Sequence, residues 1–193
     1  MSIGLARSPH VDIPGLSRPT GALDLGDALA PYRGPWSARL AAHLLRRAGF
    51  GGYPSEIART LAQGRGAAVE GLLAVPSAAS IAPPENLFDV ASFIEGNGGL
   101  AILRSKDVSQ KRMLFKQVRM QELRSIFALQ QWWLQRMLRN GAPLQERMAF
   151  YFHGHFTTAS MQKGVTPTMT FAQNQLFRSY ALGNLRDLTK AIS

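Results

Sequence analysis

The feature that most constrains the fold is a stretch of 35 residues, Ser105 to Arg139, that contains neither glycine nor proline. As an α-helix it would be roughly 50 Å long at about 1.5 Å per residue. Apolar side chains cover most of its circumference, and a helix of this kind is packed on several sides. The sequence therefore predicts one long central helix, with Phe127 in the core and the adjacent Trp132 and Trp133 anchoring two packing surfaces.

Shorter helices are expected on both sides of this stretch, because capping residues, prolines and glycines occur at positions where they would begin and end helices. The predicted helices are Trp36 to Ala48, Pro54 to Gln63, Ala67 to Ala74, one opened by Pro143, one from Pro167 to Gly183 capped by Thr166, and one begun by Asn184. Pro76 to Pro84 is predicted as a linker and Gly96 to Gly99 as a break. No segment alternates with period two, so the predicted class is all-α, an irregular helical array around the long helix.

The first 35 residues differ from the rest in composition. Five prolines and five glycines are interleaved between Met1 and Pro35, which predicts an irregular arm. The expected organisation is this arm at 1–35 and a helical domain at 36–193.

The net charge of +10 lies entirely in the second half of the chain. Residues 1–100 carry 8 basic and 8 acidic side chains, whereas residues 101–193 carry 14 basic and 4 acidic ones. The basic residues are spread over several helices and form no long run, so a solvated surface or an acidic partner is favoured over a nucleic acid.

Several classes of protein are disfavoured by what the sequence lacks. It contains no cysteine, which excludes disulfides and thiolate metal sites. No stretch approaches the run of about 20 apolar residues of a membrane span, and the N-terminus does not have the pattern of a secretory signal. The cytoplasm is the default expectation for such a chain.

Two of the four histidines in the sequence, His153 and His155, lie close together in the segment Pro143 to Thr158. On a continuous helix they point about 160° apart, so joint ligation of a metal requires the chain to leave the helix near Gly154. One interpretation is a divalent metal site completed by His43, Glu146 or residues outside this chain. The other is a pair of hydrogen-bonded histidines in an aromatic core.

A second histidine environment is predicted on the helix that begins near Trp36. Its basic side carries Arg39, His43, Arg46 and Arg47 opposite an apolar face. This cluster is either a solvated helix face, on which the arginines keep His43 neutral, or an anion-binding site.

The end of the sequence leaves an apolar face without a partner. The helix begun by Asn184 presents Leu185, Leu188 and Ile192, and the chain stops at Ser193. We therefore expect a chain that is cut short and exposes apolar surface.

Three segments resemble a known family, the bacterial proteins catalogued as domain of unknown function 1800. They are Ala41 to Gly51, Pro143 to Thr158 and Gln173 to Leu188, in matching order and spacing. The family usually has Asn between the two histidines, where this chain has Gly154.

The resemblance implies a helical, uncharacterised bacterial protein and no particular reaction. Family members are commonly more than twice this length, so the chain is expected to be the N-terminal part of a longer domain. An acidic C-terminal part of that domain, or a separate protein, is the partner that the basic half predicts.

Two functions follow from the sequence. One is a helical binding or assembly module, which we favour for this chain. The other is half of a metal-dependent enzyme site built on His153 and His155.

Overall fold

The computed structural model describes residues 30–74, 81–139, 141–159 and 164–193. Contacts divide the chain into two units, Met1–Pro35 and Trp36–Ser193, and the helices described below lie in the second. Over the described residues the chain is all-α, with nine helices and no strand, as predicted. Residues 1–29 of the predicted arm and 76–80 of the predicted linker lie outside the described residues.

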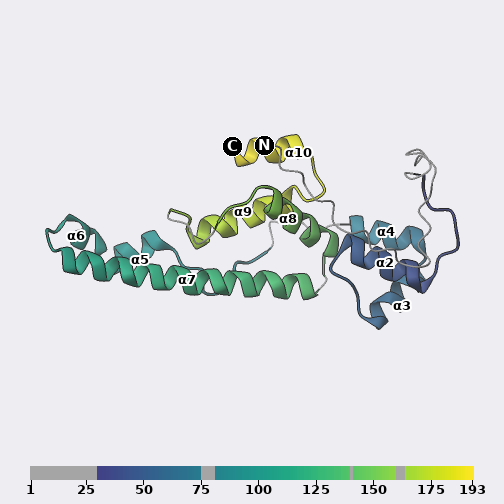
Figure 1. Cartoon of the computed structure of the whole chain (residues 1–193), viewed down its shortest axis with the longest axis horizontal. Coiled ribbons are helices and arrows are strands. Elements are labelled where there is room, and N and C mark those ends of the chain that lie inside the picture. Colours follow the sequence, from purple (N-terminus) through teal and green to yellow (C-terminus); the bar gives the residue numbers. More distant parts are fainter. Residues whose placement is uncertain (1–29, 75–80, 140, 160–163) are drawn as a thin grey trace, which may run out of the picture. The chain divides into compact units, whose positions relative to one another are not determined.

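Figure 1 shows the helices in chain order. They are α2 (Ala38–Ala48), α3 (Pro54–Gln63), α4 (Arg65–Leu73), α5 (Val90–Gly96), α6 (Gly99–Arg104), α7 (Val108–Arg139), α8 (Pro143–His155), α9 (Pro167–Ser179) and α10 (Leu185–Ile192). The predicted caps are confirmed at α9 and α10. Thr166 Oγ1 accepts the backbone N–H of Met169 at 3.2 Å, and Asn184 Oδ1 accepts that of Arg186 at 2.8 Å.

The long helix begins three residues later than predicted, at Val108 instead of Ser105. The Ser105 hydroxyl donates to the carbonyl of Ile102 at 2.8 Å and accepts the N–H of Asp107 at 3.2 Å, which separates α6 from α7. Asp107 Oδ1 then accepts the N–H of Gln110 at 3.0 Å. An aspartate in this position caps a helix, so the side chains before Val108 fix where α7 starts.

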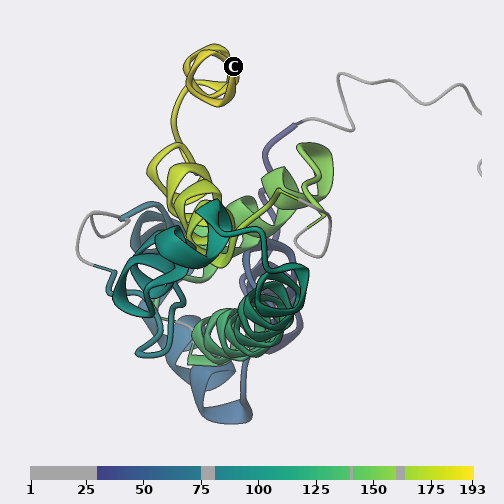
Figure 2. The same ribbon diagram turned by 90° about the vertical axis from the view of Figure 1, so that its left-hand side faces the viewer.

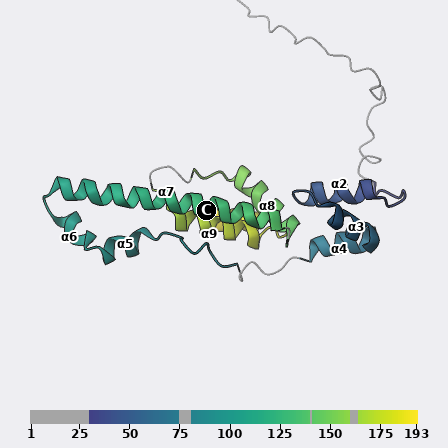
Figure 3. The ribbon, with the colours of Figure 1, turned by 90° about the horizontal axis from the view of Figure 1, so that it is seen from below.

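Helices α5, α6, α8 and α9 contact α7. Helices α8 and α9 contact it and each other, and both lie above it in Figure 2, which looks nearly along α7. Helix α5 and the segment before it also contact α7, as the view from below shows (Figure 3). The buried Ser125 hydroxyl holds this segment by accepting the N–H of Phe88 at 2.8 Å and donating to the carbonyl of Asn86 at 3.1 Å.

The main apolar cluster joins α8, α9 and α10. Its buried members are Ala149, Phe152, Phe177 and Leu188, and Trp133, Met148, Phe156, Leu176, Tyr180 and Ile192 pack around them. The prediction that α10 leaves an open apolar face is therefore wrong for Leu188, which is completely buried, and for Ile192. Only Leu185 of the three predicted residues is exposed, because α10 folds back onto α9.

Helix α7 is the longest helix, but it is not buried on all sides. Its buried residues are Leu114, Val118, Ser125, Ile126 and Leu129. The placement of Phe127 in the core was wrong, because its side chain is 61% exposed. The described residues around α7 leave the Phe127 side of the helix open to solvent.

The adjacent tryptophans of α7 do pack on two different surfaces, as predicted. The Trp132 ring meets the edge of Phe171 with centroids 5.5 Å apart, and Trp133 meets Phe150 at 6.0 Å. These contacts attach α7 to α9 and to α8, respectively.

Candidate functional site

A buried ion pair lies where α7, α8 and α9 meet. Glu146 on α8 is 2% exposed and Arg178 on α9 is 1% exposed. Arg178 Nε donates to Glu146 Oε1 at 3.0 Å, and Arg178 Nη2 donates to Oε2 at 2.8 Å. A bidentate pair of this geometry is among the strongest side-chain interactions in proteins.

Helix α7 adds two more donors to the same carboxylate. Arg136 Nε donates to Glu146 Oε1 at 3.0 Å, and Trp133 Nε1 donates to Oε2 at 3.1 Å. The ring of Trp132 has both guanidinium groups near it, at 5.4 Å for Arg136 and 5.0 Å for Arg178. Three helices therefore share one carboxylate.

The electrostatics of Glu146 follow from these contacts. Burial alone would raise the pKa of its carboxyl group, but the hydrogen bonds and charges of Arg178 and Arg136 outweigh burial and hold the pKa below its ordinary value. Each oxygen accepts two hydrogen bonds, which fills the capacity of a carboxylate. Glu146 is thus occupied as a structural anion and has no free lone pair for a proton or a metal.

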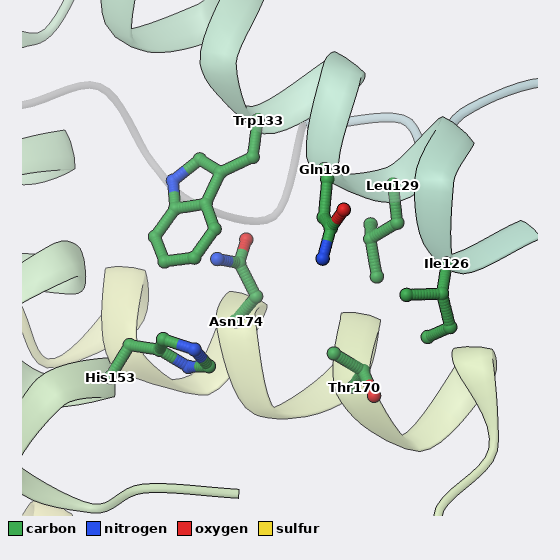
Figure 4. A pocket seen from close by; sticks show the side chains of 7 residues that line it. All are labelled: Ile126, Leu129, Gln130, Trp133, His153, Thr170 and Asn174. Carbon is green, nitrogen blue, oxygen red and sulfur yellow. The ribbon is translucent and has the colours of Figure 1, made fainter. Parts of the chain in front are cut away.

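A small pocket adjoins this network. It has a volume of about 60 Å³ and is lined by Ile126, Leu129, Gln130, Trp133, His153, Thr170 and Asn174. Figure 4 shows these side chains converging from α7, α8 and α9, with the Asn174 amide and the His153 ring both near Trp133. Asn174 and His153 are among the lining residues whose side chains can donate a hydrogen bond to a ligand.

His153 is half-buried and held by aromatic neighbours. Its ring is edge-on to Trp133 at 5.2 Å and to Phe177 at 6.4 Å. Burial lowers the pKa of His153, which keeps the imidazole neutral near pH 7. This is the aromatic environment that one of the two sequence interpretations expected.

His155 lies elsewhere. Helix α8 continues through Gly154 to His155, so the turn away from the helix that joint metal ligation would need does not occur. The exposed His155 ring stacks on Tyr151 at 6.2 Å and is edge-on to Phe156 at 4.8 Å. His153 and His155 therefore have different neighbours.

The described residues contain no group of three or more His, Cys, Asp or Glu side chains placed to hold a metal ion. Within this part of the chain the structure does not bring His43, Glu146 and the His153–His155 pair together as one ligand set. Metal ligation by His153 and His155 stays a prediction.

The predicted basic cluster lies on the solvent side of α2. Arg39, His43, Arg46 and Arg47 are all exposed, and the opposite side of the helix buries Ala41 and Leu45. Anion binding by these arginines also stays a prediction.

A second feature is an exposed row of apolar side chains on α7, which we call the α7 stripe. Met113, Met120, Phe127 and Leu134 recur every seven residues, and Leu138 follows one turn later. A seven-residue repeat drifts only about 20° per heptad around a helix, so these side chains share one face. The stripe forms the side of α7 that the neighbouring helices leave exposed to solvent.

Sequence reasoning did not identify Arg178, Asn174 or the α7 stripe as functional candidates. The heptad spacing of the stripe was visible in the sequence. The partnership of Arg178 with Glu146 was not, because the two residues are 32 positions apart and meet only through helix packing.

Comparison with known proteins decides the family. Residues 43–193 match the family model described as protein of unknown function DUF1800. The chain belongs to the DUF1800 family. No curated protein and no solved structure matches it. In the described part of this DUF1800 domain, no helix has the length and apolarity needed to cross a membrane.

Proposed function

We propose that this DUF1800 domain is a helical binding module that docks an acidic amphipathic helix of another protein along α7. The observation that carries the proposal is the α7 stripe, an apolar row that runs along most of a 32-residue helix and is open to solvent. Contiguous exposed apolar surface of this kind marks interaction sites. Its heptad spacing is the spacing at which one helix packs along another.

The net positive charge of α7 indicates that its partner helix is acidic. The helix carries seven basic residues and one acidic residue, Glu122. Glu122 forms an ion pair with Arg119 at 3.7 Å, and Arg136 is engaged by Glu146. No ion pair within the described residues engages the remaining five, which are Lys111, Arg112, Lys116, Arg124 and Arg139. Glutamate or aspartate beside the apolar row of a partner helix would complement them.

Two other occupants fit less well. A second copy would bring the same basic α7 against itself, and like charges at an interface oppose association. A membrane surface suits a helix with a wide apolar face, whereas the stripe is one side chain wide and is flanked by Gln117, Gln131 and Gln135.

The test uses a synthetic helical peptide of about four heptads with Leu at the a and d positions and Glu at the e and g positions. We expect it to bind the full chain, with affinity falling as salt is raised, while a peptide with Lys in place of Glu does not bind. Phe127→Asp should weaken binding at least about tenfold, because it puts a charge in the middle of the apolar row.

Phe115→Asp is the matched control, since Phe115 is exposed on another side of α7. It should bind as the wild type does, and both variants should keep the wild-type unfolding curve. Equal binding of the Glu and Lys peptides, or no effect of Phe127→Asp, contradicts the proposal. Sedimentation as a dimer, or binding to phosphatidylserine vesicles, that Phe127→Asp abolishes would assign the stripe to a second copy or a membrane instead.

The metal-dependent alternative has a direct test of its own. Metal analysis of protein purified without chelator should find little zinc or nickel in this chain, because two imidazoles on different sides of α8 bind such ions weakly. Stoichiometric metal that is lost in both His153→Ala and His155→Ala would favour the metal site over the binding module.

A further inference from the structure

We propose that the pocket between α7, α8 and α9 binds a small carboxylate, held by the side chains of Asn174 and His153. The pocket is separate from the α7 stripe, so this proposal does not depend on the one above. It rests on a buried donor and a histidine that have no hydrogen-bond partner within the described residues, on an excess of positive charge, and on a small apolar lining.

The unpaired donor is the amide nitrogen of Asn174. The residue is 4% exposed, and its Oδ1 accepts a hydrogen bond from Arg178 Nη1. Because a guanidinium can only donate, this contact fixes which end of the amide faces Arg178. The Nδ2 group is consequently turned away from Arg178, and it has no hydrogen-bond partner in the described residues. A buried N–H without a partner is destabilising, so an acceptor in the pocket would be stabilised there.

The second group is His153. The described residues contain no hydrogen-bond partner for either ring nitrogen, although the ring is fixed by its edge-on contacts with Trp133 and Phe177. A neutral imidazole carries one N–H donor. Together with Asn174 Nδ2 it offers two donors, one for each oxygen of a carboxylate.

The surrounding charge favours an anion over a cation or a neutral molecule. The network beside the pocket contains two guanidinium groups, Arg136 and Arg178, and one carboxylate, Glu146. Its formal charge is therefore +1, and Glu146 has no remaining acceptor capacity. Arg178 and Glu146 are almost completely buried, whereas the Arg136 side chain is 31% exposed, so the charge of Arg178 is the one that solvent screens least at the pocket.

The size and lining of the pocket limit the rest of the ligand. A volume of about 60 Å³ has room for only a few non-hydrogen atoms. Ile126, Leu129 and the Trp133 ring supply apolar walls for a short hydrocarbon. This chemistry fits acetate to butyrate, or the carboxylate of an Asp or Glu side chain on a peptide, and it excludes a nucleotide.

The experiment follows the His153 imidazole by NMR while the full chain is titrated with sodium propionate. Propionamide, which has nearly the same shape without the charge, is the ligand control. We expect saturable shifts with propionate and none with propionamide. A second titration with an N-acetylated glutamate amide distinguishes a free short-chain acid from a peptide side chain.

His153→Phe keeps an aromatic ring against Trp133 and Phe177 but removes both nitrogens. It should weaken propionate binding, measured by calorimetry, at least about tenfold, the loss expected for one charge-assisted hydrogen bond. His155→Phe, the matched change at the exposed histidine of the same helix, should bind normally. Thr170→Leu is a second variant that fills the pocket; among the described residues the Thr170 hydroxyl bonds only to the carbonyl of Thr166, the N-cap of α9. It should also abolish binding.

Three results would overturn the proposal. They are no saturable binding of either carboxylate, equal shifts with propionate and propionamide, and unchanged binding in a folded His153→Phe or Thr170→Leu variant. The first would mean that water alone satisfies Asn174 and His153.

Discussion

At the scale of single residues, Phe177 and Phe127 show how differently two phenylalanines contribute to this domain. Phe177 is completely buried between α8, α9 and α10, whereas Phe127 is mostly exposed. Phe177→Ala should lower the free energy of unfolding by about 3–5 kcal/mol, because it leaves a cavity. Phe127→Ala should cost less than about 1 kcal/mol, because its side chain is already in water.

Urea unfolding followed by circular dichroism measures both changes. A large loss of stability in Phe127→Ala would mean that the open side of α7 is covered in solution. Equal, small losses in both variants would contradict the burial of Phe177.

The burial of His153 predicts how stability depends on pH. Its pKa is lowered in the folded protein, so below the unfolded value of about 6.5 the unfolded chain binds more protons than the folded one. Stability should therefore be unaffected by His153 above about pH 6.5 and decrease as the pH falls from there through the folded-state pKa. Protonation of Glu146 lowers stability only at more acidic pH, because its pKa is below the ordinary value of 4.5.

Thermal unfolding at a series of pH values gives this dependence. In His153→Phe the decrease below about pH 6.5 should be smaller than in the wild type. An unchanged decrease in this variant would contradict the role of His153.

At the scale of elements, one carboxylate ties three helices together. Glu146→Gln leaves Arg178 buried without its counter-charge, and such a change typically costs about 3–5 kcal/mol. Arg178→Met alone should be similarly destabilising, because it removes the bidentate partner of the buried Glu146 carboxylate. The double variant should be more stable than the sum of the two losses predicts, as measured by urea unfolding. Additive losses would show that the two side chains do not act as a pair.

Local signals made most helix boundaries predictable. Pro54, Pro143 and Pro167 each occupy the first position of a helix, and Thr166 and Asn184 cap the helices that follow them. These signals act within one turn, so a sequence pattern contains them. Helix α6 was not predicted, and the predicted start of α7 was three residues early, because that start depends on side-chain hydrogen bonds of Ser105 and Asp107.

The candidate site was less predictable, because it depends on contacts between distant segments. The importance of the segment around His153 was recognised, but its partners Trp133 and Asn174 come from α7 and α9. Which side of α7 is covered also depends on where α8 and α9 pack, and an apolar circumference does not specify that choice. For this reason Phe127 was wrongly placed in the core and the α7 stripe was not identified.

At the scale of the whole molecule, the uneven charge of the sequence has two structural consequences. Two of the four acidic residues after Leu100, Glu122 and Glu146, are engaged in ion pairs with arginines. Basic residues of α7 are consequently left without counter-charges among the described residues. The same excess of positive charge that points to an acidic partner along α7 also favours an anion in the pocket.

The last prediction concerns the arm at 1–35, which we propose is dispensable for folding of the helical domain. Contacts separate Met1–Pro35 from Trp36–Ser193, and Trp36 itself belongs to the helical unit, where its Nε1 donates to the carbonyl of Thr60 at 3.4 Å. A chain starting at Trp36 should therefore keep its helical circular dichroism and melt within about 2 °C of the full chain. A chain starting at Ser37 should melt lower, because it loses the contact with α3. A much larger drop on removal of 1–35 alone would mean that the arm contributes to the core.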